Sequence, residues 1–203
     1  MKKLLIVLMI FFIFSISSCG EKSSEKMYIE AARLTDEEKD ITELLGIDTQ
    51  YHIYDFYLDD TVNSIQINTY ELIDGKWSNI PGGGTQALTD SEGRIALDFK
   101  KISDGLRVAI QSENSNGAVS NYKENNDNSN AGYATSYLTD KKEFVYEEEI
   151  PLAIQIVTSK NEINSYIVDY FYQPEEYEKY GYEHVYAITV LFSQKAVNDL
   201  TGF

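Results

Sequence analysis

The chain has 203 residues, of which 43% are hydrophobic and 13% aromatic. This composition is too apolar for a disordered chain, and a single cysteine excludes a fold stapled by disulfides. With 17 basic and 33 acidic residues the formal net charge is −16, which opposes binding to the phosphate backbone of nucleic acids. One compact globular domain, or two small ones, therefore remains.

The first residues have the pattern of a secretory signal peptide. Lys2 and Lys3 are followed by an uninterrupted apolar run of eleven residues, from Leu4 to Phe14. At about 1.5 Å per residue, a helix of that length is too short for the ~30 Å of hydrocarbon in a bilayer. We therefore expect a segment that is cleaved rather than a permanent transmembrane helix.

The end of this segment resembles the lipobox of bacterial lipoproteins. Residues 16–19 read Ile-Ser-Ser-Cys, an aliphatic residue and two small ones before the cysteine. The resemblance implies removal of the signal peptide 1–18, and attachment of a diacylglyceryl group and a further acyl chain, such as palmitate, at Cys19. Residues 19–33 would then tether the protein to the outer face of a cell membrane.

The amino-acid composition indicates the type of organism. Lysine, asparagine and isoleucine are abundant and only three arginines occur, a usage typical of low-GC Gram-positive bacteria. The alternative to lipidation is a conventional secretory signal in which Cys19 is a chance or buried thiol.

A short helix is predicted at residues 35–45. Thr35 precedes Glu38 by three positions, which is the spacing of a capping box, and Ile41 and Leu44 then fall on one helical face. After this segment the hydrophobic period changes towards two. We therefore expect β-strands almost to the end of the chain.

Alternation and turn residues predict the strands of the first half. The apolar pattern slips after Thr69, which indicates a bulge, and Asp74-Gly75 and Asp104-Gly105 predict hairpin turns. The run from Pro81 to Gly84 interrupts the pattern. The strands expected here cover residues 51–58, 65–72, 95–99 and 106–110.

The second half begins with a polar segment, residues 113–132, which contains seven asparagines and predicts a long loop or linker. Pro151 is expected to mark the start of a strand. The last expected strand is almost entirely apolar and should be central in its sheet. The strands predicted here cover residues 143–148, 151–158, 165–172 and 184–193.

These eight or nine short strands predict a mainly β fold. We expect an antiparallel β-sandwich, Ig-like or similar, preceded by one short N-terminal helix. A single domain would cover residues 34–203. The alternative is a division into two small β units at residues 113–132.

The sequence offers little for catalysis. Its two histidines, His52 and His184, lie on expected strands or their edges, and no hydrolase, phosphate-binding or dinucleotide motif occurs. We therefore predict no catalytic residue and no cofactor. A segment from Asp127 is similar to an oxygen-rich calcium loop, with Asp127 as the candidate ligand, but Ala131 and Leu138 stand where ligands belong. A solvated loop is the simpler interpretation.

Tyrosine supplies the candidate binding residues. Of 16 tyrosines, seven lie between Tyr166 and Tyr186. Flat rings with a hydroxyl can contact a sugar or a protein partner, whereas packing at a sheet margin is the alternative. The candidates are Tyr170 on an expected strand and Tyr177, Tyr180 and Tyr182 in the connection that follows it.

Together these observations predict a lipid-anchored cell-surface domain, without enzymatic activity, that binds a glycan or a protein. One alternative is a carboxylate-dependent glycosidase-like enzyme, which needs two carboxyl groups ~5–9.5 Å apart across a cleft, one with a raised pKa. The other is a structural subunit of the envelope or of a complex, which would expose a large apolar patch.

Overall fold

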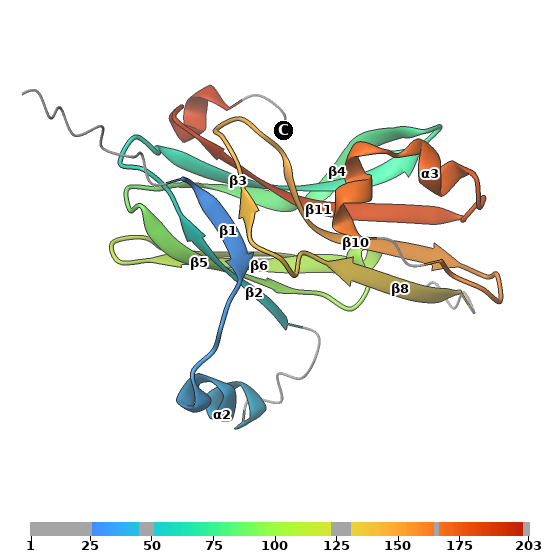
Figure 1. Ribbon diagram of the computed structural model, residues 1–203, viewed down its shortest axis with the longest axis horizontal. Coiled ribbons are helices and arrows are strands. Elements are labelled where there is room, and N and C mark those ends of the chain that lie inside the picture. The colour runs from blue at the N-terminus through green and yellow to red at the C-terminus, as the bar shows by residue number, and fades with distance from the viewer. Residues whose placement is uncertain (1–25, 45–50, 123–130, 165–166, 201–203) are drawn as a thin grey trace, which may run out of the picture.

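Two antiparallel sheets form a β-sandwich in the computed structural model, which describes residues 26–44, 51–122, 131–164 and 167–200. Figure 1 shows the two layers, with the chain crossing repeatedly between them. The predicted fold class is confirmed. The first 25 residues, which include the proposed signal peptide and Cys19, lie outside the described residues.

Sheet A has six strands in the order β7-β6-β5-β2-β1-β9. They are β1 (Tyr28–Ala31), β2 (Tyr51–Tyr57), β5 (Glu92–Asp98), β6 (Gly105–Ser112), β7 (Asn116–Tyr122) and β9 (Lys142–Glu143). Sheet B has five strands in the order β4-β3-β11-β10-β8. They are β3 (Ser64–Ile73), β4 (Lys76–Ala87), β8 (Gly132–Tyr137), β10 (Ile150–Thr158) and β11 (His184–Ser193).

The described helical segments are short. They are α2 (Asp36–Leu44), η2 (Ile102–Asp104), η3 (Val168–Tyr172), α3 (Glu175–Glu178) and η4 (Val197–Asp199). The predicted helix is present as α2, and its capping box is formed: the Thr35 N–H donates to Glu38 Oε2 at 2.7 Å, and the Glu38 N–H donates to Thr35 Oγ1 at 3.2 Å. Within the described residues no side chain of α2 is buried, and Leu44 on its apolar face is 85% exposed.

The main core lies between the sheets. Alternate residues of each strand point inward, among them Ile29, Ile95, Val190 and Phe192, which are fully buried. Tyr54 is also buried, and its hydroxyl donates to the backbone oxygen of Leu152 at 2.8 Å, which links sheet A to sheet B.

A second apolar cluster lies on the outer face of sheet B, where η3 and α3 cover the ends of β10 and β11 (Figure 1). Trp77 stacks on Phe171 with ring centroids 5.1 Å apart, and its indole N–H donates to the Phe171 backbone oxygen at 2.8 Å. Tyr177 is 1% exposed and meets Trp77 edge-on. Sheet B is therefore apolar on both faces over this end.

The strand predicted at 165–172 is wrong, because Val168–Tyr172 form η3 and residues 165–166 lie outside the described residues. Sequence alternation suits a strand, but the outward side chains of Ile154, Ile156 and Ala187 need a cover that a strand within the sheet cannot give.

The strand predicted at 143–148 is reduced to β9. After it the chain turns at Glu147, which has a φ of 65°, and crosses onto the outer face of sheet B. There Glu149 Oε1 accepts hydrogen bonds from Asn68 Nδ2 at 2.7 Å and from the Tyr70 hydroxyl at 2.9 Å. These polar contacts fix a loop where alternation alone predicted a strand.

Three weakly patterned segments are strands. Residues 28–31, assigned to the tether from the sequence, form β1, so α2 lies between two strands of sheet A. The expected loop 113–132 includes β7 and the start of β8, while residues 123–130 are not described. Each sheet combines strands from before and after that segment. β7 and β8 are edge strands, which need little apolar alternation, and β1 is only four residues long, so sequence patterning missed all three.

The expected break at residues 81–84 lies inside β4, which bulges there: Ile67 pairs with Gly84 and Thr69 pairs with Ile80. A Cβ at Gly83 would stand 1.9 Å from the Ile67 backbone oxygen, so glycine is required there. Other predictions are confirmed. Asp74 and Gly75, with φ of 49° and 73°, turn the β3–β4 hairpin, and β11 is the central strand of sheet B.

Candidate functional site

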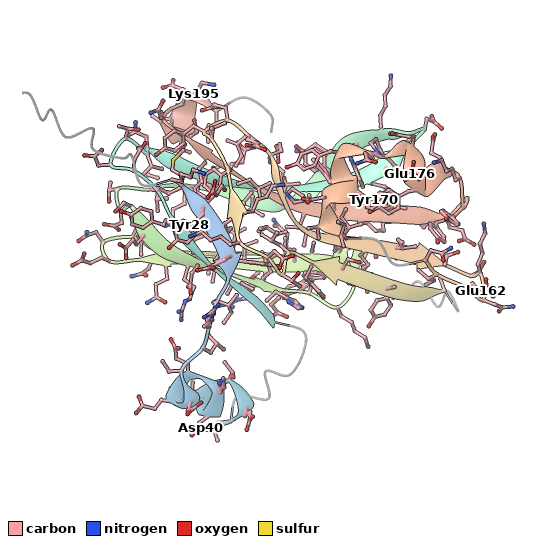
Figure 2. The ribbon with its side chains drawn as sticks, viewed as in Figure 1. Tyr28, Asp40, Glu162, Tyr170, Glu176 and Lys195 are labelled. Carbon is pink, nitrogen blue, oxygen red and sulfur yellow. The ribbon has the colours of Figure 1, made fainter. Side chains whose placement is uncertain are left out.

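A groove of about 1080 Å³ lies on the outer face of sheet A. Strands β1, β2 and β5 form its floor, α2 contributes Glu38, and the ends of β5 and β6 form the far side. Figure 2 shows Tyr28 on β1 and Asp40 on α2, which mark the strand and the helix that border it. The charged lining consists of Glu30, Glu38, Asp55, Asp90, Glu92, Glu113 and Arg94.

Strand register builds the floor in two rows across the sheet. In the first row Tyr28 lies opposite Tyr57, and Tyr57 lies opposite Glu92. In the second row Glu30 lies opposite Asp55, and Asp55 lies opposite Arg94. Outward side chains that share a row are direct cross-strand neighbours. The floor is thus one aromatic and acidic row beside one row of charged side chains.

Arg94 joins the floor to the helix. Its Nε donates to Asp55 Oδ1 and its Nη1 donates to Glu38 Oε1, each at 2.7 Å. Hydrogen bonds from the Thr35 backbone and the Arg94 side chain lower the pKa of Glu38 to about 2. Asp55, followed by Glu38, raises the pKa of Arg94. This bridge positions α2 over the groove.

The far side of the groove is held by a second carboxylate. The Ser112 hydroxyl donates to Asp90 Oδ2 at 2.6 Å, and Asn114 donates to the same carboxylate through its backbone N–H at 2.8 Å and its Nδ2 at 2.6 Å. Ser112, followed by Asn114, lowers the pKa of Asp90. Asp90 therefore fixes the turn that leads into β7 and stays ionised.

The groove lining is strongly negative. It carries six carboxylates and one guanidinium, a net charge of −5, and Arg94 is the only basic side chain among its described residues. Since Arg94 contacts Asp55 and Glu38, Glu30 faces Asp55 across the strands without a cation of its own in the lining. Like charges directly opposite each other are destabilising, so this row favours an added cation.

The aromatic row already contacts a cation at its margin. The Tyr28 and Tyr57 rings are stacked with centroids 5.7 Å apart, and Lys141 Nζ lies 3.2 Å from the centroid of Tyr28. A ring face attracts an ammonium group through its quadrupole. The geometry therefore combines carboxylates and ring faces, the two chemistries that recognise lysine and arginine side chains.

The tyrosines predicted from sequence divide between core and surface. Tyr177 is buried and Tyr170 packs against the same cluster under η3 and α3 (Figure 2), so neither ring is presented as a flat surface platform. Tyr180 and Tyr182 stack on each other with centroids 5.7 Å apart. Lys160 Nζ lies 5.8 Å from the Tyr182 ring. This pair is the part of the predicted site that reaches the surface.

Neither histidine is placed at a catalytic constellation in the described part of the chain. His52 stacks on Tyr137, and His184 Nδ1 lies 2.8 Å from Glu71 Oε1 on the neighbouring strand. Within the described ranges, no group of three or more His, Cys, Asp or Glu side chains is arranged to hold a metal ion. Asp127, the candidate calcium ligand, lies outside those ranges.

Hydrogen bonds lower the pKa of five carboxyl groups in the described residues: Glu38, Asp59, Asp90, Glu147 and Glu183. A glycosidase-like general acid needs the opposite, a raised carboxyl pKa. These five groups therefore do not have the property of such an acid.

The groove was not predicted from the sequence. Its floor depends on β1, which was assigned to the tether, although the order Tyr28, Ile29, Glu30 does alternate outward, inward, outward. That alternation over a few residues was the available signal. The register that brings it beside β2 and β5 has no local signature.

Comparison with family models, curated proteins and solved structures finds no match for this chain. Fold and site thus define a mainly β protein, an antiparallel sandwich with an acidic groove on one outer face. None of the described helices has the length and apolar character needed to cross a bilayer.

Proposed function

We propose that the chain is a lipid-anchored binding module on the extracytoplasmic face of a bacterial membrane, and that it binds a positively charged segment of a partner protein in the groove of sheet A. The observation that carries this proposal is the second cross-strand row, where Glu30 and Asp55 face each other and one guanidinium serves Asp55 and Glu38.

Charge supports a cationic partner. A lysine or arginine of the partner that reaches Glu30 relieves the repulsion from Asp55 and gains a charge-assisted hydrogen bond. Tyr57 and Tyr28 lie in the adjacent row and can contact the alkyl stem and the charged end of the same side chain. The chain's formal charge of −16 adds long-range attraction during encounter.

The address rests on the lipobox-like sequence at Cys19. Two acyl chains anchor a protein stably, and the excess negative charge of the sandwich is repelled by an anionic lipid surface. That repulsion keeps an acidic groove directed towards partners rather than towards the membrane.

Binding is tested with a hexalysine peptide titrated into the chain that begins at Gly20. Every strand of both sheets lies between Tyr28 and Ser193, so this chain contains the whole described fold. Combined Glu30→Gln and Glu92→Gln should weaken binding by about fivefold to tenfold, by calorimetry at low salt. Affinity should also fall as salt is raised.

The matched control replaces Glu162 and Glu175, exposed acids outside the groove, by glutamine. Both double variants lose the same charge, so non-specific attraction changes equally. An equal loss of affinity in both variants would exclude the groove as the site.

Anchoring is tested on the full chain in a Gram-positive host. The unmodified protein should partition into the detergent phase of Triton X-114 and incorporate labelled palmitate. Cys19→Ala should abolish the palmitate signal. Palmitate incorporation that persists without Cys19 would exclude this residue as the lipid anchor.

A glycan is the second candidate ligand, because Tyr180 and Tyr182 are stacked at the surface with an interplanar angle of 12° beside Lys160. An array of cell-wall and host glycans, probed with and without a calcium chelator, tests it. A hit lost in Tyr180→Ala would place a sugar there, and a hit lost on chelation would direct attention to Asp127.

A further inference from the structure

The four edge strands of the sandwich differ in how they are protected. β9 is two residues long and both are charged, Lys142 and Glu143. β4 contains Pro81 and is itself bulged at residues 81–83, opposite Asn68 of β3. Charge, proline, bulges and short length are the features that keep sheet edges from pairing with other chains.

The remaining edges are β7 and β8. β7 contacts β4 at the seam between the sheets, although six of its seven residues are exposed: Asn121 Nδ2 donates to the Gly83 backbone oxygen at 3.4 Å, and a Cβ at Gly84 would meet Val119 at 3.3 Å. β8 has a strand on one side only within the described residues. It carries none of the protective features.

β8 is a regular, uncharged strand. Its six residues read Gly-Tyr-Ala-Thr-Ser-Tyr, and its register with β10 runs from Gly132 to Tyr137 without a shift. The Leu138 N–H donates to the Leu152 oxygen at 2.9 Å, and this bond shows which residues of β8 are hydrogen-bonded to β10. Because hydrogen-bonded positions alternate in an antiparallel pair, Tyr133, Thr135 and Tyr137 direct their backbone N–H and C=O groups away from β10.

We propose that β8 pairs antiparallel with β8 of a second copy of this chain, which joins two B sheets into one continuous sheet. A twofold axis through Thr135 places this residue opposite its own copy. Tyr133 then lies opposite Tyr137 of the partner subunit, an aromatic cross-strand pair. This inference is independent of the groove on sheet A.

Charge argues for a second copy as the occupant. A chain with a net charge of −16 repels itself wherever acidic surfaces meet. β8 is a strip with no charged side chain, so two copies can approach along it without placing carboxylates face to face. An edge with a regular antiparallel register is also self-complementary under twofold symmetry. A cationic partner finds no carboxylate on β8.

Sedimentation velocity over a range of concentrations tests the proposal on the chain that begins at Gly20. We expect a monomer and dimer equilibrium. Tyr133→Lys, at a side chain 40% exposed, should raise the dimer dissociation constant about tenfold or more, since it removes the aromatic pair and charges the edge. A monomer at every concentration, or a dimer unaffected by this change, would overturn the proposal.

Tyr122→Lys is the matched control, because Tyr122 is a 58% exposed tyrosine at the end of β7, an edge strand of sheet A. It should leave the dimer intact. Circular dichroism reports whether either variant is folded.

A crosslink provides a test that does not depend on weakening the edge. The chain from Gly20 contains no cysteine, so Thr135→Cys introduces a single thiol on the proposed axis. Mild oxidation should give a covalent dimer, whereas Ser120→Cys on β7 should stay monomeric. Equal crosslinking of the two variants would show random collision and contradict the paired edge.

Discussion

The two outer faces of the sandwich differ in a way that sequence patterning alone does not show. The outer face of sheet B is apolar at one end, where η3 and α3 cover it (Figure 1). The outer face of sheet A is charged and stays open as a groove. Both faces come from strands with the same period of two. The identity of the outward residue decides whether a face becomes a third layer or a surface for partners.

Substitutions in the cover that η3 and α3 form on sheet B should lower the free energy of unfolding far more than substitutions in the floor of the groove. Tyr177→Ala removes a buried ring from the cluster with Trp77 and should lower the free energy of unfolding by about 3–5 kcal/mol. Tyr57→Ala, at a half-buried ring in the groove, should cost about 1 kcal/mol. Urea unfolding of both variants checks the comparison, and similar losses would contradict it.

Arg94 connects α2 to the open face of sheet A through its hydrogen bonds to Glu38 and Asp55. Arg94→Gln removes two charge-assisted hydrogen bonds at a side chain about one third exposed, and should cost about 1 kcal/mol. Hydrogen exchange should accelerate in α2 while the sheets stay protected, because the bridge to Glu38 holds the helix. Arg107→Gln on β6 serves as the control, and unchanged exchange in α2 would refute the bridging role.

The features predicted correctly from the sequence are those that depend on residues close together in the chain. The capping box at Thr35, the turn at Asp74 and the central strand β11 depend on neighbours in the chain, and the structure confirms all three. β7 and β8 were missed because edge strands carry weak patterns, and β1 was missed because it is only four residues long. The groove could not be predicted, because its rows depend on pairing between β1, β2 and β5, and register is a tertiary property.

The pH dependence of α2 follows from Glu38. Its pKa is lowered from its ordinary value of 4.5 to about 2 in the folded chain. A carboxyl with a lowered folded pKa stabilises above its unfolded pKa, and that contribution is lost as the pH falls towards the folded value. The order of α2 should therefore decline between pH 4.5 and 2 while the sheets persist, as followed by amide NMR signals. Glu38→Gln should remove this transition, and a transition that survives the change must come from another group.

The smallest expected effect concerns Lys141, at the margin of the groove. Lys141 is exposed and places its ammonium 3.2 Å from the Tyr28 ring centroid, where a cation of the partner would also fit. Lys141→Ala should change the free energy of unfolding by less than about 0.5 kcal/mol. It should nevertheless strengthen hexalysine binding about twofold, since it frees the ring and makes the groove more negative. Glu30→Gln should act in the opposite direction, and Lys160→Ala beside Tyr182 should leave the affinity unchanged. Weaker hexalysine binding by Lys141→Ala would contradict this prediction. The Tyr28 ring would then serve to hold Lys141 in place, and the row of carboxylates alone would recognise the cation of the partner.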